Sequence, residues 1–157
     1  MSAYAESSAV LAWLLDERLG TEVRTLLAAQ DFVFASDLTL IECDRVLLRA
    51  AVVGGLSEGE AAGRSAHLTE VSSHWQMLRI SPEIVDRARR PFPGEPIRTL
   101  DAIHLASALV ARAAVSELKL LSLDERMRRA GRALGLELLP PQRTRAKQCG
   151  PRAGVAR

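Results

Sequence analysis

The chain has 157 residues, of which 48% are hydrophobic and 25% charged, the balance of a soluble globular protein with a single core. A net charge of +2 does not indicate nucleic-acid binding by itself, and 4% aromatic residues argue against a protein that binds single strands by stacking bases on aromatic rings. No apolar run is long enough to span a bilayer, and the two cysteines form neither a metal motif nor a disulfide pattern, so we expect a cytoplasmic protein.

Strand and helix patterns alternate along the chain, which favours a three-layer α/β/α sandwich around a central parallel sheet. The segment RRPFPGEPIR, with three prolines, is the one clear irregular loop. We expect one domain over residues 1–140 and a basic, disordered tail over 141–157. The expected strands are residues 3–5, 32–35, 75–80, 118–121 and 136–139, and the expected helices are 7–15, one from 21, one from 36–39 to about 53, 57–72, one from 81, 99–115 and 122–134.

Four acidic residues, far apart in the sequence, lie at expected junctions between a strand and a helix: Glu6, Glu42, Asp101 and Asp124. In an open parallel sheet, the ends of the strands and the starts of the following helices gather along one edge. Several carboxylates that meet there repel one another unless protons or a cation offset their charge. The sequence therefore predicts a site for a hard divalent metal with oxygen ligands, suited to phosphodiester chemistry.

Acids at helix starts also occur without any chemistry, because a carboxylate there interacts favourably with the helix dipole. Thr39 and Glu42 match the spacing of a capping box, and Asp124 could be a simple N-cap or lie within a box that starts at Ser122. Glu6 and Asp101 are harder to explain in this way, because both lie beside strongly apolar segments.

Other polar residues are weaker candidates. His104, one turn after Asp101, could orient that acid or contact a phosphate, although such a histidine is more often a hydrogen-bonded core residue. Ser8 could hold a water or a ligand oxygen, and Arg45 and Arg49 could bind the phosphates that flank a cut site or simply be solvated. Zinc, dinucleotide and P-loop motifs do not occur.

Four blocks of sequence carry a resemblance to a known family: YAESSAVLAWLL, LTLIECDRVLLRA, LDAIHLASAL and LLSLDERMRRAGRALGLELL. In their order and spacing, the chain resembles PIN-domain ribonucleases and, among them, the VapC-type toxins of toxin–antitoxin pairs. The resemblance implies that Glu6, Glu42, Asp101 and Asp124 bind Mg²⁺ or Mn²⁺ and activate water to cut RNA, and that an antitoxin protein blocks the site. The family usually has Asp at the first of these positions, and the extra methylene of Glu6 moves its carboxylate by roughly 1.5 Å.

The expected partners are thus an RNA substrate, a cognate antitoxin and a second copy of the chain in a homodimer. Two alternative functions stay open. One is a catalytically inactive PIN-like module that binds RNA or protein, with Glu6 as the mark of a decayed site. The other is a metal-dependent phosphatase or DNA nuclease that uses the same acids on a different ester.

Overall fold

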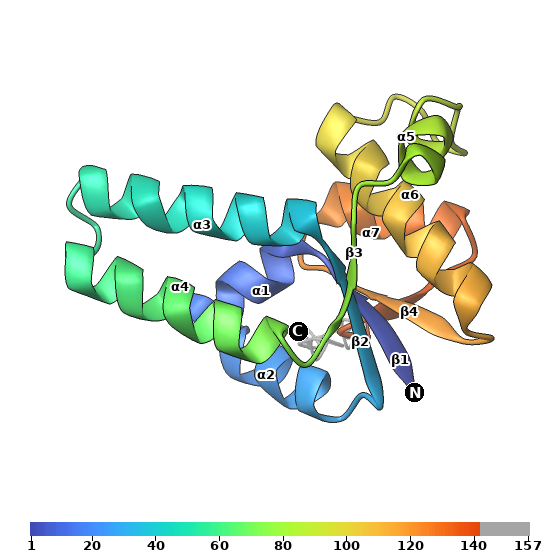
Figure 1. The fold of residues 1–157 in the computed structure, drawn as a ribbon. Coiled ribbons are helices and arrows are strands. Elements are labelled where there is room, and N and C mark those ends of the chain that lie inside the picture. Colours follow the sequence, from blue (N-terminus) through green and yellow to red (C-terminus); the bar gives the residue numbers. More distant parts are fainter. Residues whose placement is uncertain (142–157) are drawn as a thin grey trace, which may run out of the picture.

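The computed structural model describes residues 1–141, so the predicted tail lies, apart from its first residue, outside the described residues. Five parallel strands form one sheet in the order β3-β2-β1-β4-β5, with β1 at its centre (Figure 1). The predicted α/β/α sandwich is confirmed. The strands are β1 (Ser2–Ala5), β2 (Phe32–Ser36), β3 (Gln76–Leu78), β4 (Leu118–Leu121) and β5 (Glu137–Leu139), and the helices are α1 (Ser7–Leu14), α2 (Gly20–Ala28), α3 (Asp37–Val52), α4 (Glu58–Ser72), α5 (Pro82–Ala88), α6 (Thr99–Ala114) and α7 (Glu125–Ala133).

Two hydrophobic cores cover the two faces of the sheet, because successive strand residues point in opposite directions. Tyr4 lies level with Phe34 and Leu120 on the neighbouring strands, and these three side chains pack against α5, α6 and α7. The residues on either side of Tyr4 point the other way, into the core beneath α1, α2, α3 and α4. The central strand β1 and its neighbours β2 and β4 are therefore covered on both faces, as in other parallel sheets.

Helices α3 and α4 pack side by side as an antiparallel pair that extends away from the sheet (Figure 1). The predicted capping box begins α4: the Ser57 amide donates to Glu60 Oε2 at 2.8 Å, and the Glu60 amide donates back to Ser57 Oγ at 3.2 Å. Within residues 1–141, no helix is both long and apolar enough to cross a membrane.

Helix α3 starts within the predicted range of 36–39, whereas α7 starts three residues later than the predicted 122, with Asp124 as the simple N-cap that the sequence allows. Helix α3 has Ser36 as its N-cap, with the Ser36 amide facing Thr39 Oγ1 at 3.5 Å, so Glu42 lies in the second turn and caps nothing. Helix α7 begins only at Glu125, because the Asp124 side chain caps it, and Ser122 stays in the preceding loop. These two helix starts leave polar side chains free to face the carboxyl edge of the sheet.

The carboxyl edge of the sheet is extended beyond the strands themselves. The Glu6 amide donates to Leu121 O at 3.0 Å, and the Ser122 amide donates to Leu139 O at 3.1 Å. The buried guanidinium of Arg128 then joins the loops, with bonds of 2.8 Å to Ser122 O, 3.0 Å to Leu139 O and 2.7 Å to Pro140 O. These bonds fix the backbone from which several site side chains project.

Candidate active site

Glu6 follows β1 directly and is the N-cap of α1, with only 5% of its surface exposed. Its carboxylate lies in a cage of serine donors. Oε1 accepts from Ser7 Oγ at 2.8 Å and from the Ser8 amide at 3.1 Å, while Oε2 accepts from Ser122 Oγ at 2.7 Å and from Ser8 Oγ. Three donors that Glu6 has to itself, together with the Ser7 hydroxyl that it shares with Glu42, explain how this acid is tolerated in a nearly closed site.

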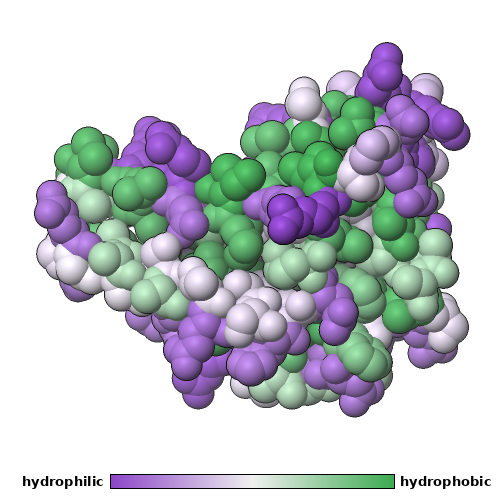
Figure 2. Space-filling view, viewed as in Figure 1, coloured by the Kyte–Doolittle hydropathy of each residue, from purple (hydrophilic) through white to green (hydrophobic). Residues whose placement is uncertain are grey.

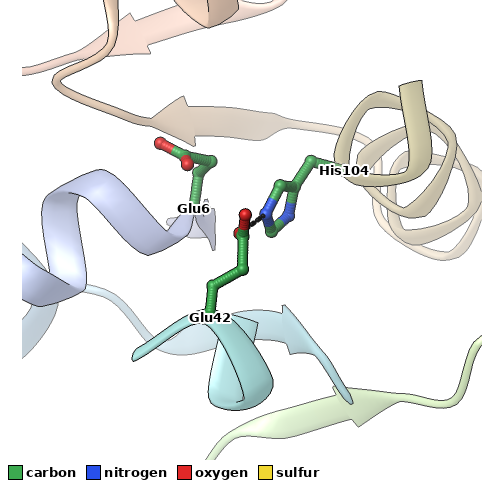
Figure 3. Close-up of side chains that lie close together, drawn as sticks. All are labelled: Glu6, Glu42 and His104. Carbon is green, nitrogen blue, oxygen red and sulfur yellow. Dashed lines mark hydrogen bonds and ion pairs between the residues drawn. The ribbon is translucent and has the colours of Figure 1, made fainter. Parts of the chain in front are cut away.

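Glu42 projects from α3 into the same region and remains partly exposed. Its Oε2 lies 2.6 Å from Ser7 Oγ and 2.7 Å from His104 Nε2 (Figure 3). Burial would raise the pKa of Glu42, but the hydrogen bonds from His104 and Ser7 together lower it below its ordinary value. Glu42 is therefore an ionised carboxylate held by side chains, and its interpretation as part of a helix cap is wrong.

Ser7 Oγ stands between these two acids, 2.8 Å from Glu6 Oε1 and 2.6 Å from Glu42 Oε2. A hydroxyl has a single hydrogen, so at any moment it can donate to only one of the two carboxylates. The other contact brings lone pairs together without a hydrogen between them, which is unfavourable. The arrangement lacks positive charge between Glu6 and Glu42, and a bound cation would supply it.

Asp101 and Asp124 complete the acidic edge. Asp101 lies in the first turn of α6, and its pKa is raised by burial and by the negative charges of Asp124 and Glu6. Asp124 accepts the backbone amides of Arg126 at 2.7 Å and Met127 at 3.2 Å, and the Arg126 guanidinium lies 3.2 Å away. Burial would raise the pKa of Asp124, but these amides and the guanidinium charge lower it.

The tightest group of possible metal ligands in residues 1–141 consists of Glu6, Glu42 and His104, whose ligand atoms all lie within 4.8 Å of one another. Asp101 and Asp124 are outside this group; Asp101 lies close enough to Glu6 and Asp124 for their charges to raise its pKa further than burial does alone. Carboxylate oxygens in such a set suit a hard divalent ion such as Mg²⁺ or Mn²⁺. The residues present therefore fit the predicted metal.

The three candidate substrate contacts lie in two different environments. The Ser8 hydroxyl is occupied inside the site: it donates to Glu6 and accepts the amides of Leu123 at 2.9 Å and Asp124 at 3.1 Å. Arg45 and Arg49 are exposed further along α3, around a shallow hollow that they share with apolar side chains of that helix. Figure 2 shows the surface hollowed between the α3–α4 pair and the part formed by α5 and α6. A role in binding substrate stays a prediction for all three residues.

Sequence reasoning missed two side chains of the site, Ser7 and Ser122, and placed a third, His104, among the weaker candidates. Hydroxyls near helix starts are common and usually cap the backbone, so only the fold shows that Ser7 and Ser122 contact the acids. His104 was weighed mainly as a core residue. It is indeed buried, with 1% exposed, yet its Nε2 points at Glu42. The spacing Asp101-x-x-His104, one helical turn, was the available signal.

The family model of the PIN domain matches residues 3–133, which include every acid of the site. The chain belongs to the PIN-domain family. It is 32% identical over 138 residues to "Ribonuclease VapC46" of Mycobacterium tuberculosis (strain ATCC 25618 / H37Rv), which covers 88% of this chain and 96% of that protein.

Two solved structures of the same fold have lower identity. VapC20 of Mycobacterium tuberculosis, described as a sarcin-ricin loop cleaving toxin, superposes with a TM-score of 0.58 at 15% identity, covering 82% of this chain and 95% of that one. A toxin–antitoxin complex from Klebsiella pneumoniae gives a TM-score of 0.55 at 21% identity, covering 78% of this chain and 86% of that one. These likenesses establish the PIN fold, within which the four acids occupy one edge of the sheet.

Proposed function

We propose that the protein is a metal-dependent endoribonuclease of the VapC type, the toxin of a toxin–antitoxin pair, which acts on RNA in the cytoplasm. The observation that carries the proposal is the crowding of carboxylates. The Ser7 hydroxyl lies within hydrogen-bond distance of both Glu6 and Glu42. Burial and the negative charges of Asp124 and Glu6 raise the pKa of Asp101. The 32% identical ribonuclease supports RNA as the substrate class.

In this proposal Glu6, Glu42, Asp101 and Asp124 hold Mg²⁺ or Mn²⁺, directly or through waters. The bound ion supplies a water of lowered pKa and stabilises negative charge on the phosphoryl oxygens. The serine cage holds the carboxylate of Glu6, and His104 and Ser7 hold that of Glu42.

An antitoxin is the proposed protein partner, and α3 offers it an apolar surface. Leu48, Val52 and Val53 are 54%, 87% and 71% exposed, and a hollow lined by Leu48 and Ala62 lies between α3 and α4. These three exposed aliphatic side chains lie near or just after the end of α3, and a partner protein that covered them would remove them from water, which favours binding. The complex from Klebsiella pneumoniae supports an antitoxin. If the antitoxin covers these side chains of α3, the predicted homodimer must form through other residues.

One observation favours a second candidate, the inactive PIN-like binding module. The Glu6 carboxylate already accepts hydrogen bonds from Ser8 and Ser122 and shares the Ser7 hydroxyl with Glu42, so its oxygens have partners without any metal, and it stands where the family usually has Asp. An inactive module would retain the fold and the apolar surface of α3. It would bind no metal ion through its acids.

The experiment compares purified wild type with Asp101→Asn, which keeps the shape of the side chain and removes its charge. Asp86→Asn, on the exposed face of α5, is the matched control. Each protein is incubated with RNA, single-stranded DNA and small phosphate esters in Mg²⁺, in Mn²⁺ and in EDTA, and Mn²⁺ binding is followed by calorimetry.

We expect metal-dependent cleavage of RNA by wild type and by Asp86→Asn, and none by Asp101→Asn. Equal cleavage by wild type and Asp101→Asn would refute the assignment of the acids. Cleavage of DNA or of small esters in place of RNA would favour the phosphatase or DNA nuclease. The inactive module would show neither cleavage nor Mn²⁺ binding that depends on Asp101.

A further inference from the structure

A chain of buried hydrogen bonds leads from β2 to Glu42, and the proposed chemistry leaves most of it unused. Ser36 Oγ lies 3.0 Å from Tyr4 OH, Tyr4 OH lies 2.9 Å from His104 Nδ1, and His104 Nε2 lies 2.7 Å from Glu42 Oε2. Tyr4 is fully buried and His104 is 1% exposed, so bulk water does not compete for these contacts. The chain ends at an acid of the site (Figure 3).

The hydrogen between His104 and Glu42 belongs to the histidine. A glutamate carboxylate is ionised at neutral pH, and an ionised carboxylate only accepts. Nε2 therefore carries hydrogen in both the neutral and the charged form of the ring. In the neutral form, Nδ1 accepts from Tyr4 OH, and Tyr4 OH accepts from Ser36 Oγ, so every group in the chain has a partner of the right kind.

His104 has two possible roles, a metal ligand or a hydrogen-bond donor to Glu42, and this arrangement decides between them. A nitrogen that donates hydrogen to a carboxylate has no lone pair for a metal ion, although Nε2 is close enough to the acids to be considered as a ligand. Glu42 Oε2 is already bonded to His104 and Ser7, whereas Oε1 accepts no hydrogen bond from residues 1–141. The histidine thus fixes one oxygen of Glu42 and leaves the other for an ion.

We infer that Tyr4 and His104 are positioning residues for Glu42: Tyr4 OH fixes the imidazole with its hydrogen on Nε2, and Nε2 directs Glu42 Oε1 toward the metal. The inference rests on the proposed function, since it assigns residues that serve the same metal site. Partners that orient a metal ligand from behind typically change metal affinity or activity by about 10–100-fold when they are removed.

The test measures Mn²⁺ affinity by calorimetry for wild type, His104→Leu, His104→Gln, Tyr4→Phe and the double variant Tyr4→Phe/His104→Leu. His74→Leu, at an exposed position, is the control for the loss of a histidine. We expect His104→Leu to weaken Mn²⁺ binding about 10–100-fold and His104→Gln, whose amide can donate to Glu42, to restore most of that loss. Tyr4→Phe should weaken binding alone and have no further effect when His104 is already Leu, because Tyr4 acts only through the imidazole.

Two spectroscopic measurements complete the test. Nitrogen NMR of the metal-free wild type should show hydrogen on His104 Nε2. Pulsed EPR of the Mn²⁺-bound protein labelled with ¹⁵N-histidine should show no coupling to a directly bound nitrogen. A coupling that His104→Gln abolishes would make His104 a metal ligand and overturn the inference, as would Mn²⁺ affinity that is unchanged in His104→Leu.

The outcomes also separate this inference from the proposed function. Wild type that binds Mn²⁺ and cuts RNA, together with a His104→Leu variant that does both equally well, defeats the inference alone. Wild type that neither binds Mn²⁺ nor cuts RNA defeats both. If His104→Leu does not fold, the comparison of Tyr4→Phe and His104→Gln with wild type, and the spectra of wild type, decide the question.

Discussion

Asp101→Asn should have opposite effects on stability with and without metal. The pKa of Asp101 is raised by burial and by the charges of Asp124 and Glu6, so its surroundings disfavour the ionised form overall, despite the favourable dipole of α6. A raised pKa in the folded state means that the contribution of this group to stability is lost as pH rises through that pKa. At pH 7 the ionised Asp101 therefore destabilises the metal-free protein, and its replacement by Asn stabilises it.

The magnitude follows from the partial exposure of the site. Removing a repulsion between partly solvated charges stabilises the folded protein by about 0.2–1 kcal/mol, which raises the melting temperature of a chain of this size by up to about 4 °C. A metal ion at 100 times its dissociation constant stabilises the folded protein by about 2.7 kcal/mol, or roughly 5–10 °C. Wild type should gain this amount with Mn²⁺, and Asp101→Asn should gain little.

The assay is thermal unfolding at pH 7 in EDTA and in saturating Mn²⁺, with Asp86→Asn as control. The order of melting temperatures should invert: Asp101→Asn above wild type in EDTA, and below it in Mn²⁺. Lowering the pH toward 4 should remove the advantage in EDTA, because Asp101 then becomes protonated. A variant that melts below wild type in EDTA at pH 7, or that gains as much from Mn²⁺ as wild type, would refute the reasoning.

Three further predictions concern the acids and the backbone around them. Ser122→Ala removes a buried donor to Glu6 Oε2 and should lower the free energy of unfolding, measured in urea, by about 1.5–3 kcal/mol. Ser73→Ala, at an exposed position, should lower it by less than about 0.5 kcal/mol. Arg128→Met removes the guanidinium donor from Ser122 O and Pro140 O and leaves Leu139 O with the Ser122 amide alone, so it should cost more than about 3 kcal/mol, unlike a change of the exposed Arg129 to Met. Equal stabilities of the two variants would show that these bonds contribute nothing. In metal-free protein, carbon NMR should find that Asp101 titrates at higher pH than Asp124, and Asp124→Asn should lower the pKa of Asp101; an unchanged value would mean that the two charges do not interact.

The fold was readable from the sequence because each element carries a local signal. Strands such as Leu118–Leu121 are short apolar runs between helices, and Ser57 with Glu60 marks the start of α4 by a capping box that the structure contains. The predicted start of α7 was three residues early, because several polar residues near a helix start compete to be the cap. Ser36 and not Thr39 begins α3, and this choice decides whether Glu42 serves the backbone or the site.

The candidate site was only partly readable. Acids at strand ends are visible in the sequence, and their convergence follows from the topology of a parallel sheet. The groups that hold them are not visible, since Ser122 is 116 residues from Glu6 and His104 is 62 residues from Glu42 along the chain. Hydrogen bonds between such distant residues depend on rotamers and on sub-ångström spacing, which periodicity does not encode.

The central claim is that the acids at the carboxyl edge of the sheet share one metal ion. The most direct measurement is a crystal structure grown with Mn²⁺, with anomalous scattering recorded to locate the ion. The account predicts one strong peak within bonding distance of Glu42 Oε1 and of an oxygen of Glu6 or Asp101. No peak at this edge, or a peak held by other residues while Glu6 stays in its serine cage and Asp101 is remote, would contradict it.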